Sequence, residues 1–174
     1  YEITRSDWSS DVCSSDLLIP AFAVGRSQEI LYWLARHYDE WQIARWQIYL
    51  DSPMALRVTD VYSRHAGLFD RDGQQRWRSD SNPFQLPNLR LINSVQDSQA
   101  LNARGGGCII IAGSGMCNGG RIRHHLRHNL WRDNAHVVFA GYQARGTLGR
   151  ALVDGAEYVT IFGERIKVNA KRHT

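Results

Sequence analysis

A glycine-rich loop in the middle of the sequence has the composition of an anion-binding site. It reads Gly113-Ser114-Gly115-Met116-Cys117-Asn118-Gly119-Gly120, follows an apolar run and opens a helical pattern. Glycines let the backbone turn tightly, and the first amides of a helix carry a partial positive charge that favours phosphate or carboxylate. Arg121 and Arg123 fall in the first helical turn, where cations oppose the helix dipole. We therefore expect an anion here, with a turn that merely joins strand to helix as the alternative.

Two familiar phosphate-binding motifs do not fit this loop. The dinucleotide pattern G-x-G-x-x-G matches Gly113 and Gly115 but then meets Asn118. The P-loop pattern matches Gly115 and Gly120, but arginine and isoleucine follow where it requires lysine and then serine or threonine. The sequence therefore supports neither a dinucleotide nor a nucleoside triphosphate as cofactor.

Three histidines follow the loop and raise the question of a metal. His124 and His128 lie one helical turn apart, but a metallopeptidase helix needs glutamate where His125 stands. Because Arg123 and Arg127 lie among them, we interpret this stretch as a solvent-exposed basic face that could touch nucleic acid. The spacing assigns no Ser/His/Asp or Cys/His triad, so we predict neither a metal site nor a catalytic residue within the chain.

Two further loops combine a cation with a flexible backbone. Arg26 follows Gly25 at the start of a helical pattern, and the stretch 141–147 contains Tyr142 and Arg145 between glycines. An aromatic ring for stacking together with positive charge is how proteins hold single-stranded nucleic acid without reading its sequence.

Strand and helix patterns alternate along the chain. The expected helices are 26–39, 53–64, 95–104, 120–131 and 147–153, and the expected strands are 18–22, 47–50, 89–92, 108–112, 136–140, 158–162 and 165–169. This alternation predicts an α/β fold with a doubly wound, mostly parallel sheet and helices on both faces. Ligands of such sheets bind outside the carboxyl ends of the strands, which directs attention to the loops after Phe22, Leu50, Ala112 and Ala140.

The composition is that of an ordinary globular domain. The 174 residues are 43% apolar and 22% charged, with a formal net charge of +4, which excludes a disordered or low-complexity chain. No apolar run approaches the roughly 20 residues of a membrane helix, so we expect no membrane span. The three cysteines do not form a disulfide framework, and we expect Cys108 and Cys117 to pack as small apolar groups. Unpaired thiols and the lack of a targeting signal predict a cytoplasmic protein.

Residues 1–17 do not look like part of a fold. They match, codon by codon, the in-frame translation of a sequencing-library adapter, although a natural acidic linker is the alternative, and we expect this segment to be artefactual and disordered. It contains Arg5 and four of the acidic residues, so 157 residues remain, with 20 Lys+Arg against 13 Asp+Glu and a net charge of +7. A basic body favours a polyanionic partner.

Four blocks of sequence, taken in order, resemble one family. They are LIPAFAVGRSQEILYWL (18–34), IYLDSPMA (48–55), IIIAGSGMCNGGRIRHHL (109–126) and VVFAGYQARGTLGRAL (137–152). The chain resembles the β-CASP ribonucleases of the metallo-β-lactamase superfamily, over essentially all of 18–174. The nearest resemblance is to the bacterial and archaeal RNA-specific branch.

The resemblance implies an enzyme with two domains. A metallo-β-lactamase domain binds two zinc ions through an H-x-H-x-D-H motif, and an inserted β-CASP domain clamps single-stranded RNA over the metals. Zinc-activated hydroxide then attacks the scissile phosphate. We also expect the complete parent protein to be a candidate homodimer.

This sequence departs from the full family pattern. It contains no H-x-H-x-D-H motif, and the family's F-S-A-H motif would follow a stretch like Ile166–Thr174. We therefore expect 18–153 to be the β-CASP domain and 154–174 to be the start of the returning metallo-β-lactamase segment. A fragment of this kind binds no zinc itself and should be inactive.

Within this resemblance, loop position selects the candidate contacts. Phosphate or RNA-backbone contacts are expected from Arg26, Ser114, Gly115, Met116 and Arg121, and base stacking from Tyr142. Two alternatives stay open: a non-catalytic RNA-binding or scaffold β-CASP subunit, and a free-standing Rossmann-like nucleotide-binding domain with a small-molecule pocket.

Overall fold

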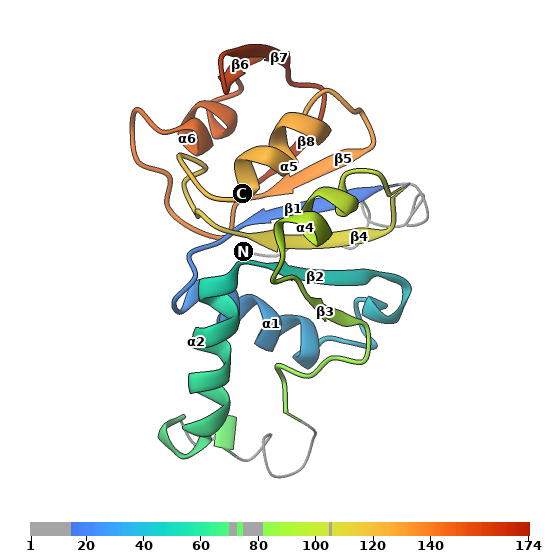
Figure 1. The fold of residues 1–174 in the computed structure, drawn as a ribbon, viewed down its shortest axis with the longest axis vertical. Helices are drawn as coiled ribbons and strands as arrows, with labels where there is room; N and C mark the ends of the chain where they lie inside the picture. The colour runs from blue at the N-terminus through green and yellow to red at the C-terminus, as the bar shows by residue number, and fades with distance from the viewer. Residues whose placement is uncertain (1–14, 70–72, 75–81, 105) are drawn as a thin grey trace.

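The computed structural model describes residues 15–69, 73–74, 82–104 and 106–174, and it shows strands and helices in alternation (Figure 1). The strands are β1 (Asp16–Pro20), β2 (Gln47–Asp51), β3 (Leu89–Leu91), β4 (Cys108–Ala112), β5 (Ala135–Val138), β6 (Tyr158–Ile161), β7 (Glu164–Lys167) and β8 (Lys171–His173). The helices are α1 (Arg26–Arg36), α2 (Pro53–Arg64), α4 (Val95–Leu101), α5 (Ile122–Asn129) and α6 (Leu148–Val153), with short 3₁₀ turns at Ile43–Arg45 and Ala66–Leu68.

Six strands form one sheet, in the order β3-β2-β4-β1-β5-β8, and every neighbouring pair is parallel. At the centre, Leu18 of β1 lies opposite Ile110 of β4 and Val137 of β5. Strands β6 and β7 pair antiparallel as a separate hairpin. The predicted α/β fold with a mostly parallel sheet is confirmed.

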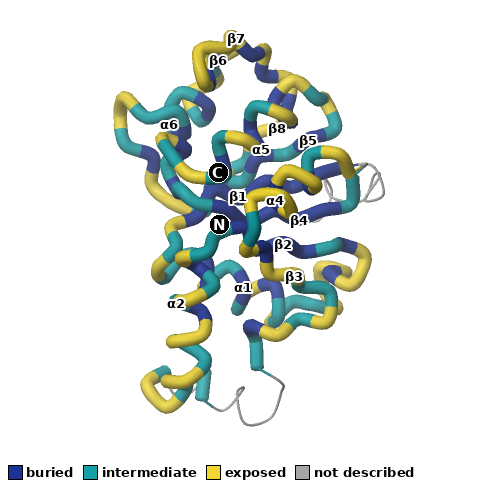
Figure 2. Tube along the Cα trace, in the orientation of Figure 1, coloured by how far each residue is buried: buried dark blue, intermediate teal, exposed yellow. Residues whose placement is uncertain are grey.

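Helices cover both faces of the sheet because alternate residues of the central strands point to opposite sides. Leu17 and Ile19 of β1 pack with α1 and α2, whereas Leu18 packs with α4, α5 and α6. Figure 2 shows the central strands as the buried middle of the molecule. Cys108 and Cys117 are buried in the second of these cores, and burial raises the pKa of their thiols to about 11 and about 12. Both cysteines pack as apolar groups, as expected.

The chain reverses its winding between two adjacent strands. β1 leads through α1 to β2 on one side of the pair, and β4 leads through α5 to β5 on the other side. Since α1 and α5 lie on opposite faces, the loops that follow β1 and β4 diverge at the carboxyl edge. Such a switch point is where open α/β sheets bind their ligands.

The N-terminal strand contradicts the disorder that we expected at the end of the segment 1–17. Asp16 and Leu17, which we assigned to a disordered artefactual segment, belong to β1 and are buried. Leu17 pairs in register with Ile109, and Asp16 forms an ion pair of 2.8 Å with Arg132. Residues 1–14 lie outside the described residues, so the expectation for them is untested. The domain limits at 17 and 153 stay predictions.

The C-terminal residues also differ from expectation. The hairpin β6–β7 matches the two strands predicted there, but β8 was not predicted, and it extends the main sheet beside β5. Three residues are too few for an alternating pattern to be recognised, so the sequence held no signal for this strand.

Two stacked histidines join β8 to the sheet and predict a pH dependence. The imidazoles of His136 and His173 are parallel within 2°, with Nδ1 of His136 2.9 Å from Nε2 of His173. Burial, followed by the charges of His173 and Lys171, lowers the pKa of His136 below its usual 6.5. In the unfolded chain His136 therefore takes up its proton at a higher pH than in the folded chain. The free energy of unfolding should fall as the pH drops through about 6.5 towards the folded pKa.

Urea denaturation at a series of pH values checks this expectation. His136→Asn should reduce the loss of stability between about pH 6.5 and 5. It should not abolish the loss, because the pKa of His128 is also lowered, by burial and then by Arg127. An unchanged pH profile in the variant would contradict the assignment.

Candidate nucleic-acid interface

The glycine-rich loop after β4 is folded by its own hydrogen bonds. The amide of Ser114 donates to the carbonyl of Gly119 at 3.1 Å, and the amide of Gly119 donates back to Ser114 Oγ at 3.2 Å. The amide of Ile122 donates to the carbonyl of Gly113 at 2.9 Å, which closes the turn into α5. Gly120 has φ of +70°, and a Cβ there would lie 2.2 Å from the carbonyl oxygen of Gly113. Only glycine fits that position.

Some amides of this loop are left for a ligand. Among the described residues, the N–H groups of Met116 and Gly120 donate to no acceptor, and both residues are at least partly exposed. Backbone N–H groups of a glycine-rich turn are donors suited to a phosphate oxygen. These two amides precede α5, and their contact with an anion stays a prediction.

Hydrogen bonds tie the loop after β5 to the same glycine-rich loop. Gln143, which is buried, donates from Nε2 to the carbonyls of Gly115 at 3.0 Å and Gly141 at 3.1 Å. At the start of α6, the amide of Leu148 donates to Oδ1 of Asn118, and the amide of Gly149 donates to the carbonyl of Met116. The two loops are thus held as one surface at the carboxyl edge.

The loop after β1 packs on the other side of the glycine-rich loop. A Cβ on Gly115 would lie 2.8 Å from Cδ2 of Phe22, so the absence of a side chain admits the Phe22 ring. Gly115 is buried there. A Cβ on Gly141 would lie 3.8 Å from Nε of Arg26, which brings Arg26 next to the β5 loop. Arg26 also forms an exposed ion pair with Glu29, at 2.7 Å.

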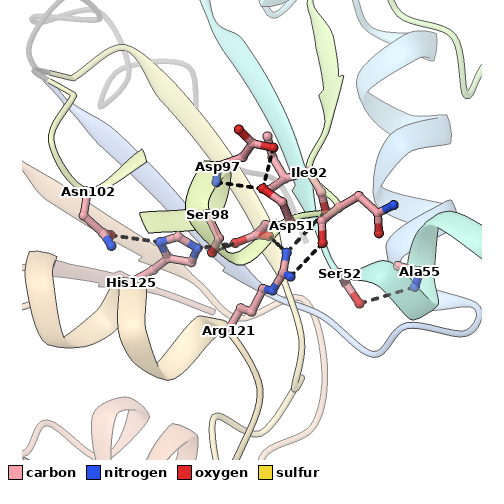
Figure 3. Close-up of polar contacts among 11 residues, drawn as sticks. Asp51, Ser52, Ala55, Ile92, Asp97, Ser98, Asn102, Arg121 and His125 are labelled. Atoms are coloured by element: carbon pink, nitrogen blue, oxygen red, sulfur yellow. Dashed lines mark hydrogen bonds and ion pairs between the residues drawn. The ribbon is translucent and has the colours of Figure 1, made fainter. Parts of the chain in front are cut away.

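Arg121 turns towards β2 and β3, where it has an internal partner (Figure 3). Its Nη1 lies 2.6 Å from Oδ1 of Asp51, and its Nη2 donates to the carbonyl of Asn93 at 2.9 Å. The anion that we expected opposite this cation is therefore at least in part the carboxylate of Asp51, the last residue of β2. A contact between Arg121 and RNA stays a prediction.

Asp51 is the centre of a buried polar network. Its Oδ2 accepts a hydrogen bond from Ser98 Oγ at 2.6 Å and lies 2.7 Å from Nε2 of His125, whose Nδ1 is 3.1 Å from Oδ1 of Asn102 (Figure 3). Burial, the strongest single influence, would raise the pKa of Asp51, but the hydrogen bonds from His125, Ser98 and Arg121 together hold it below its usual 3.8. A charged carboxylate thus joins β2, α4 and α5.

The predicted solvent-exposed basic face of α5 is wrong for His125, whereas His124 and His128 are exposed as predicted. His125 is fully buried in the Asp51 network, because it lies on the same helical stripe as Ile122 and Leu126. The tip of the β6–β7 hairpin contacts the exposed side of α5: the Phe162 ring lies 4.5 Å from the Arg123 guanidinium and 4.6 Å from the His124 ring. Arg127 pairs with Glu164 through two hydrogen bonds.

The predicted contact residues therefore fall into two groups. Arg26, Met116 and Tyr142 are at least partly exposed, and Arg26 lies beside Gly141, which Tyr142 follows. Ser114, Gly115 and Arg121 have internal roles in the loop, in packing against Phe22 and in the Asp51 network. The structure leaves their contact with RNA untested.

Sequence reasoning missed Asp51, Gln143 and Phe22. Asp51 falls between the strand expected at 47–50 and the helix expected at 53–64, which is confirmed as α2, with Ser52 capping it by accepting from the amide of Ala55. Its position at the end of a buried strand was the overlooked signal, since that is the ligand-binding edge. For Gln143 the sequence offered no signal, because its partner Gly115 lies in a loop 28 residues away.

Metal-binding and membrane features are absent from the part of the chain that the structure describes. Within residues 15–69, 73–74, 82–104 and 106–174, no three His, Cys, Asp or Glu side chains are grouped so that they could hold a metal ion. Over the same residues, no helix has the length and apolarity needed to cross a bilayer.

A doubly wound parallel sheet with loops hydrogen-bonded to one another at its carboxyl edge defines an α/β domain. The family model that describes the Beta-Casp domain matches residues 27–152, and the chain belongs to this family. The predicted resemblance is thereby confirmed.

Curated relatives match most of the chain. It is 42% identical over 158 residues to "Ribonuclease TTHA0252" of Thermus thermophilus, covering 91% of this chain and 36% of that protein. It is 31% identical to "RNase J-like protein" of Methanocaldococcus jannaschii (89% and 35%) and to "Transcription termination factor FttA" of Methanosarcina mazei (87% and 25%). The chain thus spans only about a quarter to a third of these relatives' length.

Proposed function

We propose that this chain is the RNA-clamping β-CASP portion of a zinc-dependent metallo-β-lactamase-fold ribonuclease that hydrolyses RNA phosphodiester bonds. The names of two relatives, a ribonuclease and an RNase J-like protein, support this reaction class. The observation that carries the proposal is the glycine-rich loop, which contacts the loops after β1, β2 and β5 and, among the described residues, still has free amides at Met116 and Gly120. Arg121, which follows it, extends these contacts to the loop after β3.

The zinc ions of the proposed enzyme do not fit the described part of this chain. His124 packs on Phe162, His125 is buried against Asp51, and the described residues offer no cluster of metal ligands. We therefore assign the metal centre and the hydrolytic step to the metallo-β-lactamase domain of the same protein, and this chain alone should be inactive. Its own residues bind and orient single-stranded RNA. The complete protein is a candidate homodimer.

A second candidate function is RNA binding without hydrolysis, as a scaffold subunit. Two relatives are named transcription termination factors, a name that does not itself specify hydrolysis. RNA cleavage by the full-length protein, with and without a zinc chelator, separates the two candidates, since a scaffold subunit leaves RNA intact in both conditions.

The nucleotide-binding alternative has less support. At the switch point, where a Rossmann-like domain would hold a nucleotide, the Phe22 ring packs directly on Gly115.

The test of the proposal is the salt dependence of binding between the full-length protein and a single-stranded RNA. Arg26→Ala should weaken binding and reduce the slope of log K against log salt by about 0.7, the value for one lost phosphate contact on a single strand. Arg121→Ala should have the same effect on affinity and slope if the guanidinium N–H groups that bond no acceptor among the described residues reach the RNA. Arg64→Ala is the control, because Arg64 is an exposed arginine of α2 that pairs with Asp60. Unchanged affinity and slope in both variants would contradict the proposal.

A further inference from the structure

Phe22 stands at the switch point of the sheet with half of its surface exposed. It follows β1, its ring lies against Gly115 in the loop after β4, and its exposed fraction is 49%. We propose that Phe22 stacks on a base of single-stranded RNA and is a base-binding site at this edge. This proposal rests on the proposed RNA-binding function. It adds that the group bound at the switch point is a nucleotide base.

The loop that carries Phe22 is held rigidly. The carbonyl of Phe22 accepts two hydrogen bonds from Ser27, from its amide at 3.2 Å and from its Oγ at 2.8 Å. Gln28 accepts from the amide of Gly25 at 2.8 Å and donates to the carbonyl of Ala23 at 3.2 Å. Since Ser27 and Gln28 are both buried, the exposure of the ring does not come from a loose loop.

The ring is supported on one side and open on another. The atoms Cγ, Cδ2 and Cε2 are those that a Cβ on Gly115 would strike, so this side of the ring rests on the glycine backbone. A ring fixed from one side and open to solvent on another can stack on a base with little loss of side-chain freedom.

Positive charge and a second aromatic ring lie at the same edge of the sheet as Phe22. Arg26, the first residue of α1, follows the Phe22 loop and lies next to Gly141, whose neighbour Tyr142 is 75% exposed. Gln143 links the loops after β4 and β5, because it donates to the carbonyls of both Gly115 and Gly141. An aromatic–cation–aromatic arrangement suits a nucleotide strand, with phosphate on the cation and bases on the rings.

The experiment measures binding of single-stranded RNA to the full-length protein with Phe22 changed in three ways. Phe22→Ala and Phe22→Leu should weaken binding about 5- to 150-fold, the range for one lost stack, and Phe22→Trp should retain it. The salt slope should stay unchanged in all three variants, because the ring carries no charge. An RNA with 2-aminopurine at successive positions should show fluorescence quenching at one position, which Phe22→Leu removes.

Trp131→Ala is the matched control. Trp131 is 59% exposed but follows α5 at the opposite, amino edge of the sheet, so its removal should leave RNA affinity unchanged. Wild-type affinity in Phe22→Leu would overturn the stacking proposal while leaving RNA binding itself intact. The proposal would also be overturned if the Phe22 substitutions lowered the melting temperature of the RNA-free protein without changing its affinity for RNA. In that case the Phe22 ring is covered by another part of the protein. If the unchanged protein binds no RNA, the proposed function fails as well.

Discussion

Replacing Asp51 by alanine should lower the free energy of unfolding by about 3–5 kcal/mol, the range for removing one partner of a buried ion pair. Asp51 has no exposed side-chain surface, and its carboxylate is shared by Arg121, His125 and Ser98. Without the carboxylate, the Arg121 guanidinium and the His125 imidazole both lose their acceptor. Urea denaturation followed by circular dichroism measures the change. Asp51→Asn keeps the shape and one acceptor oxygen, so it should be less destabilised than the alanine variant.

An exposed aspartate gives the comparison that isolates burial. Asp60 also pairs with an arginine, Arg64, but both side chains are more than half exposed. Asp60→Ala should therefore change stability by no more than about 1 kcal/mol. Equal effects at Asp51 and Asp60 would contradict the account of the buried network.

Replacing Gly120 by alanine should cost about 2–4 kcal/mol and abolish RNA binding. A residue other than glycine is strained at φ of +70°, and the new Cβ would meet the carbonyl of Gly113 at 2.2 Å, so backbone must move. That movement would displace the free amides of the loop. Denaturation and RNA titration of the same variant measure the two effects.

The adjacent glycine is the control for this substitution. A Cβ on Gly119 would meet no atom within 4 Å, and its φ is not positive. Gly119→Ala should change stability by about 0.5 kcal/mol or less. If Gly119→Ala and Gly120→Ala behave alike, the folding described for the loop is incorrect.

Local patterns were enough to predict the framework. The apolar run Cys108–Ala112 was predicted as a central strand, and it pairs with β1 on one side and β2 on the other. The helix expected at 53–64 is α2, and its start is fixed locally, by the capping hydroxyl of Ser52 and by Pro53 in the first turn.

Contacts between distant residues were beyond the reach of such patterns. Arg121 and Asp51 are 70 residues apart, and only the parallel pairing of β2 and β4 brings their loops together. The dipole argument correctly indicated an anion opposite Arg121 but could not say that the chain supplies one. For His125, by contrast, the helical spacing from Ile122 was visible in the sequence and predicts burial.

Hydrogen-exchange mass spectrometry of the full-length protein, with and without single-stranded RNA, tests most directly whether the carboxyl edge of the sheet is the RNA surface. Amides such as those of Met116 and Gly120 have no acceptor among the described residues and should exchange fast without RNA. Saturating RNA should slow exchange in peptides that cover 21–26, 113–121 and 141–147, and leave peptides covering 42–47 and 130–134 at the amino edge unchanged. Protection confined to the amino edge, or no protection of 113–121 at saturation, would contradict the claim that RNA binds at the carboxyl edge of the sheet.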